Sequence, residues 1–67
     1  MINNDEELKV TQERIGYFQR LLSQLRVSAK PYEFTSVAGS YRAEIEKMQK
    51  EALDYLTRHV TEPMATA

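Results

Sequence analysis

The side chains that could carry out chemistry are few in this chain and lie apart in the sequence. His59 is the only histidine and there is no cysteine, so His59 has no second side chain of these types with which to share a metal ion. Glu44 and Glu46 point to different faces of a helix, because neighbours on one face are three or four residues apart. Glu51 and Asp54 have that spacing but sit among basic residues. These carboxylates indicate a solvated charged face.

Motifs of catalytic sites are also missing from the sequence. There is no glycine-rich phosphate loop, no zinc-binding helix motif and no pairing of a nucleophile with a base. Sixty-seven residues with two glycines leave little room for a concave substrate pocket. We therefore predict that the protein is not an enzyme and uses no metal or cofactor.

Four basic residues, Arg14, Arg20, Arg26 and Lys30, follow one another with no acidic residue between Arg14 and Tyr32. Arg20 and Arg26 fall in the second half of the first expected helix and Lys30 just beyond its end, where cations complement the negative end of the helix dipole. A face that binds phosphate or acidic groups is the alternative interpretation. The net charge of −1 provides no overall field that would attract nucleic acid, so a nucleic-acid partner is not expected.

The elements that must position these side chains are two amphipathic helices. Apolar residues and their neighbours recur at three- and four-residue steps in two stretches, on either side of Pro31. The first contains Leu8, Thr11, Ile15, Phe18, Leu22, Leu25 and Ala29; the second contains Phe34, Ala38, Tyr41, Ile45, Met48, Ala52, Tyr55 and His59. This pattern predicts an all-α fold, an antiparallel two-helix hairpin spanning residues 5–59.

Capping residues set the expected helix bounds. We expect a lead-in over residues 1–4, helices over residues 5–28 and 35–59, and a flexible tail over residues 60–67. Asn4, with Glu7 three residues later, can cap the first helix, while Thr11 is an alternative start. Pro31 disfavours a helical conformation at the residue before it. Thr35 or Ser36 is therefore the expected cap of the second helix.

The apolar arc of each expected helix is wider than one partner helix can cover. Val10, Tyr17 and Leu21 widen the first arc to about 180°, whereas about 100° suffices for one partner. The second arc extends to Leu53 and Leu56. A twofold homodimer forming a four-helix bundle would cover this surplus, and a different helical protein is the alternative partner. The predicted interface residues are Tyr17, Phe18, Leu21, Leu22, Leu25, Tyr41, Ile45, Met48 and Tyr55.

Tyr17 and Leu21 are among the residues that widen the first apolar arc, and they are expected to matter more for association than for the packing of the hairpin itself. For Tyr17, the alternative is a plain surface residue with no role in association. No apolar run approaches the roughly 18 residues of a membrane span. The acidic N-terminal residues differ from a signal peptide. We therefore expect a small cytoplasmic protein with no membrane partner.

The sequence also resembles the helical segment that precedes the helix-turn-helix domain in some bacterial antitoxin-type transcriptional regulators. The resemblance covers roughly residues 8–58 and is carried by Val10-Thr11-Gln12, Phe18, Leu22, Tyr41-Arg42-Ala43-Glu44-Ile45 and Asp54-Tyr55-Leu56. Such regulators begin their DNA-binding domain where this chain ends. The resemblance therefore implies the dimerising or toxin-contacting part alone, and no DNA-reading residue is carried over.

Two functional hypotheses follow. The first is a helical interaction or regulatory module that acts through self-association. The second is the partner-binding component of a toxin–antitoxin or transcription-control pair. The adjacent gene products and the oligomeric state of the purified chain distinguish them.

Overall fold

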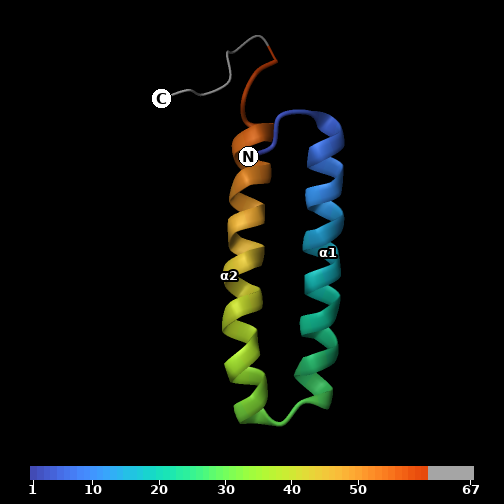
Figure 1. Cartoon of the computed structure of the whole chain (residues 1–67), viewed down its shortest axis with the longest axis vertical. Coiled ribbons are helices and arrows are strands. Elements are labelled where there is room, and N and C mark those ends of the chain that lie inside the picture. Colours follow the sequence, from blue (N-terminus) through green and yellow to red (C-terminus); the bar gives the residue numbers. More distant parts are fainter. Residues whose placement is uncertain (61–67) are drawn as a thin grey trace.

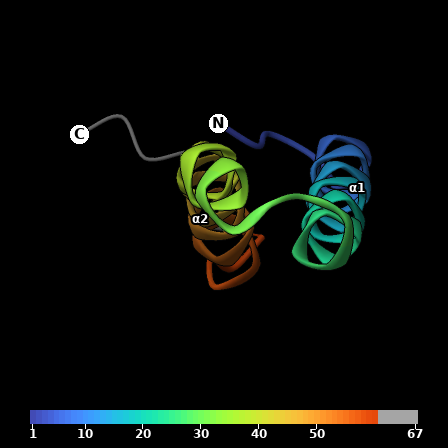
Figure 2. The same ribbon diagram turned by 90° about the horizontal axis from the view of Figure 1, so that it is seen from below.

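The computed structural model describes residues 1–60, which form two helices, α1 (Asp5–Ser28) and α2 (Pro31–Leu56). The helices lie antiparallel and side by side, joined by a connection of Ala29 and Lys30 (Figure 1). Viewed along the helix axes, α1 and α2 form one layer, and the N-terminal lead-in crosses from one helix to the other on one side of it (Figure 2). The structure confirms the prediction of an all-helical hairpin.

The first helix begins and ends where the sequence predicts. The side chain of Asn4 accepts a hydrogen bond from the backbone N–H of Glu7 at 2.8 Å, and Glu7 Oε1 accepts one from the N–H of Asn3 at 2.7 Å. This reciprocal arrangement satisfies two donors at the helix start. It places the start at Asp5 and excludes the alternative start at Thr11. Three acidic residues then occupy the first turn, at the positive end of the helix dipole.

The predicted start of the second helix at residue 35 is wrong by four residues. Pro31 is the first helical residue, where its missing N–H is harmless and its fixed φ suits the helix. Lys30 is the N-cap without a side-chain cap bond, and its carbonyl accepts from the N–H of Phe34 at 2.8 Å. Thr35 is not a cap: its hydroxyl donates back to the carbonyl of Pro31 at 3.0 Å.

The second helix also ends earlier than predicted, at Leu56 instead of residue 59. Both the N–H and the hydroxyl of Thr57 donate to the carbonyl of Leu53, at 3.0 and 2.7 Å, and close the last turn. His59 therefore lies beyond the helix and does not continue its apolar seam. Of the predicted tail, residues 61–67 lie outside the described residues.

The core of the hairpin is thin. Within residues 1–60 four side chains are buried, and α1 contributes none of them. Ile45, Met48 and Ala52 come from α2, with 6–8% of their surface exposed. The fourth and most buried is Ile2, with 4% exposed, in the segment predicted to be only a lead-in.

Residues 1–4 cross from α1 to α2 at the open end of the hairpin (Figure 1). Ile2 lines two hollows, of about 440 and 160 Å³, the larger with Val10 and Thr11 of α1 and both with Glu51 of α2. The amino group of Met1 pairs with the carboxylate of Glu51 at 3.5 Å. The lead-in thus fills the space between the helix ends that lie farthest from the connection.

Replacing Asn4 with alanine should lower the free energy of unfolding by about 1 kcal/mol, because the N–H of Glu7 loses its acceptor. Chemical unfolding followed by circular dichroism measures the loss. Asn3→Ala is the matched control, since the group of Asn3 that bonds Glu7 is its backbone N–H, which alanine keeps. Equal losses in the two variants would contradict the cap.

Candidate interaction surface

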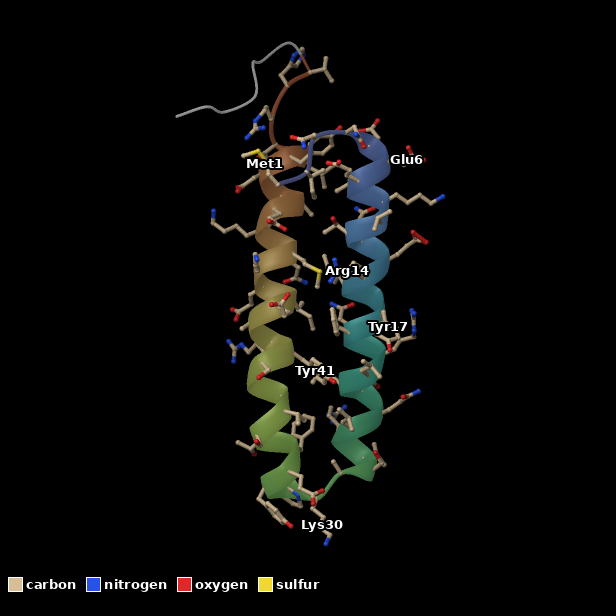
Figure 3. The ribbon with its side chains drawn as sticks, in the orientation of Figure 1. Met1, Glu6, Arg14, Tyr17, Lys30 and Tyr41 are labelled. Carbon is tan, nitrogen blue, oxygen red and sulfur yellow. The ribbon has the colours of Figure 1, made fainter. Side chains whose placement is uncertain are left out.

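An aromatic cluster holds the middle of the seam between the helices. The rings of Phe18 in α1 and Tyr41 in α2 lie with their centroids 5.6 Å apart. Tyr17 meets Phe18 edge-on at 5.7 Å. Figure 3 shows Tyr41 between the two helices and Tyr17 on the side of α1 that faces away from α2. Such pairs contribute about 0.5–1.5 kcal/mol beyond the burial of their surface.

A polar contact ties the helices together at the open end. The hydroxyl of Tyr55 in α2 donates to Asp5 Oδ1 in α1 at 2.6 Å. This hydrogen bond, followed by desolvation and by the charges of Asp5 and Glu7, raises the pKa of Tyr55 above its ordinary value. The contact joins the first turn of α1 to the last turns of α2, opposite the covalent connection.

One face of the hairpin is hollowed along the seam. A groove of about 640 Å³ lies in the half nearer the connection, and a second hollow of about 440 Å³ continues towards the open end. Gln49 lines both, so the two hollows are neighbours along the seam. We call this surface the groove face; its apolar lining consists of Ile15, Leu22, Phe34, Ala38, Ile45, Ala52 and Leu53.

The surplus apolar residues of α1 lie on the opposite face. At about 100° per residue, Val10, Tyr17 and Leu21 fall on the side of α1 away from Ile15, which lines the groove face. Val10 and Tyr17 have 51% and 54% of their surface exposed. We call these three residues the tyrosine face. The two wide apolar arcs predicted from the sequence therefore open onto different sides of the hairpin.

Polar side chains in the groove include three uncharged amides and three charged groups. Gln12, Gln19 and Gln49 lie along it, and the arginines Arg26 and Arg42 line it only in the half nearer the connection. The guanidinium of Arg42 pairs with Glu46, also at the groove, at 3.5 Å. Amides tolerate partial burial against another protein surface better than unpaired charges do.

The nine predicted interface residues occupy three environments. Ile45 and Met48 are buried within the hairpin itself, and Tyr17 is exposed. The other six are half-buried: Phe18, Leu21, Leu22, Leu25, Tyr41 and Tyr55. Of the set, Leu22 and Ile45 line the groove, whereas Tyr17 and Leu21 belong to the tyrosine face. One docking surface cannot use both faces at once.

Sequence reasoning missed Ile2, which is the most buried side chain of residues 1–60. The signal for it was a large apolar residue two positions before the helix cap, close to where a hydrophobic staple is found. The geometry does not support the alternative interpretation of the basic residues as a face that binds phosphate or acidic groups. Arg14, Arg20 and Arg26 are six residues apart, so they point to three sides of α1 and form no single anion-binding face.

Within residues 1–60, no three histidine, cysteine, aspartate or glutamate side chains gather closely enough to hold a metal ion. Neither α1 nor α2 carries an apolar stretch that is long enough to cross a membrane. No protein-family model matches the chain, and neither does any curated protein or solved structure.

The raised pKa of Tyr55 predicts a loss of stability at alkaline pH. An acid whose pKa is higher in the folded state contributes stability that is fully present below its unfolded pKa, about 10, and is lost as pH rises through the folded pKa. We expect the free energy of unfolding to fall above about pH 10. The variant Tyr55→Phe should lack this component of the fall.

Denaturant titrations of the protein and of Tyr55→Phe across that pH range measure the difference. The variant Asp5→Asn is the control, because it removes the charge beside the hydroxyl and should return the pKa of Tyr55 towards its ordinary value. Identical pH profiles for the protein and Tyr55→Phe would show that the contact is not formed in solution.

Proposed function

We propose that this protein is a helical protein–protein interaction module that acts through self-association, as a homodimer whose two hairpins form a four-helix bundle. The observation that carries the proposal is the thin core. The helices of the hairpin bury only three side chains, all from α2, while large apolar residues stay open on both faces. A helix with a wide apolar stripe normally packs that stripe against another element, and these stripes are only partly covered within the hairpin.

The size of the open face fits a stable protein interface. The 26 residues of α2 make the hairpin about 39 Å long, and two helices about 10 Å wide give it a breadth of about 20 Å. One face therefore offers about 800 Å², which matches the roughly 800 Å² that each partner contributes to a standard interface. A lone core in a chain this short supplies only about 3–5 kcal/mol, so oligomerisation is a common remedy.

A second hairpin of the same kind is the simplest partner for this surface. A twofold dimer is self-complementary, so one apolar face covers another without a new sequence. Helices from two hairpins then pack around a shared core, as they do in dimeric four-helix bundles. The function assigned to the module is to hold two copies of the chain, and anything attached to them, at a fixed distance.

We expect the purified protein to run at about twice its 7.8 kDa chain mass in light scattering coupled to size exclusion. Dilution from millimolar to low micromolar concentration should lower the mass and the helical signal together, because the hairpin loses its cover. A well-folded monomer at millimolar concentration would overturn the proposal. So would a sample that is monomeric and poorly helical at every concentration until a different protein is added.

A further inference from the structure

We propose that the second copy docks on the groove face and runs antiparallel to the first, with the connection of each hairpin beside the open end of the other. The inference rests on the proposed self-association and adds the face and the direction. Three independent features of the hairpin lead to it: the charge content of its two faces, the positions of its hollows and protrusions, and the distribution of charge along its length.

The groove face is the easier of the two faces to remove from water. On this side α2 presents the uncharged Ala38, Ile45, Gln49 and Leu53, and its two charged groove residues, Arg42 and Glu46, pair with each other at 3.5 Å; Arg26 of α1 is the third charged residue of the groove. On the tyrosine face helical spacing places Glu44 of α2 and Arg14 of α1, both exposed. Charges buried without a partner cost far more than amides do.

Shape decides the direction of the second copy. The protruding apolar residue of the groove face is Leu53, with 60% of its surface exposed, and it lies in the half near the open end. The larger hollow lies in the other half, where the small residues Ala38 and Gly39 leave room between the helices. An antiparallel twofold axis at mid-height brings Leu53 of each copy over the larger hollow of the other. A parallel arrangement would place the two Leu53 side chains at the same level.

Charge favours the same direction. In the half near the connection, residues 17–43 carry four basic side chains and one acidic, a net charge of +3. In the half near the open end, residues 1–16 and 44–60 carry five basic and eight acidic side chains, a net charge of −3. Antiparallel docking lays the positive half of each copy along the negative half of the other, whereas parallel docking sets like charges side by side.

The direction is measured by the distance between spin labels in a Lys30→Cys variant. The chain has no cysteine, and Lys30 is a helix cap without a side-chain cap bond, so one label reports on the connection alone. Antiparallel docking separates the two labels by about the length of the hairpin, about 39 Å or more. Parallel docking brings them within about 25 Å, roughly two helix diameters.

A Glu44→Cys variant is the matched control, because residue 44 lies at mid-height and the distance between its two labels is therefore about the same in either direction. A dimer in which both variants give short distances overturns the antiparallel inference but leaves the proposed function standing. A labelled sample that light scattering shows to be monomeric, while the helices remain folded, overturns the proposed function itself.

The face is tested by three substitutions to glutamate. Leu53→Glu places an unpaired charge in the groove interface and should weaken the dimer at least about tenfold. Leu21→Glu makes the same change on the tyrosine face, and Val27→Glu makes it where 85% of the side chain is already exposed. Both should leave the dimer affinity close to that of the parent, with helicity checked by circular dichroism. Loss of the dimer in Leu21→Glu, with Leu53→Glu unaffected, would overturn the choice of face.

Discussion

Two antiparallel helices touch along a single seam, and any apolar arc wider than that seam stays in water unless another surface covers it. This constraint governs the whole molecule. The middle of the seam is well filled, with Phe18 against Tyr41 and with Ile45 and Met48 buried. Outside the seam, Leu53 on one side and Tyr17 on the other remain more than half exposed. We propose that the third and fourth helices, those of a second hairpin, cover the side that carries Leu53.

The hairpin also has an open end, because the chain joins its helices at only one end. There the structure uses contacts from the first residues of the chain. Ile2 fills the gap between the helices, the amino group of Met1 pairs with Glu51, and Asp5 accepts a hydrogen bond from the hydroxyl of Tyr55. Exposed ion pairs contribute little, about 0–1 kcal/mol, so the burial of Ile2 is the larger effect. The lead-in is part of the fold.

Much of the fold could be predicted from helical periodicity and capping. The seam from Leu8 to Leu25, with the cap at Asn4, fixes α1 at both ends. The start of α2 could not be fixed, because proline disfavours helix at the residue before it yet is favoured at the first helical position. Ile2 belongs to no periodic pattern, so its burial was not foreseen. The separation of the two apolar arcs onto opposite faces depends on how the helices rotate against each other, which neither helix shows alone.

The most direct test of the account is an isotope-filtered NMR experiment on a mixture of labelled and unlabelled protein, which detects contacts between copies only. The account predicts contacts between the methyl groups of Leu53 in one copy and those of Leu22 and Ala38 in the other. These residues line the same groove but lie in different halves of the hairpin. A folded sample at millimolar concentration with no contacts between copies would contradict the claim that a second hairpin covers the surface of the first.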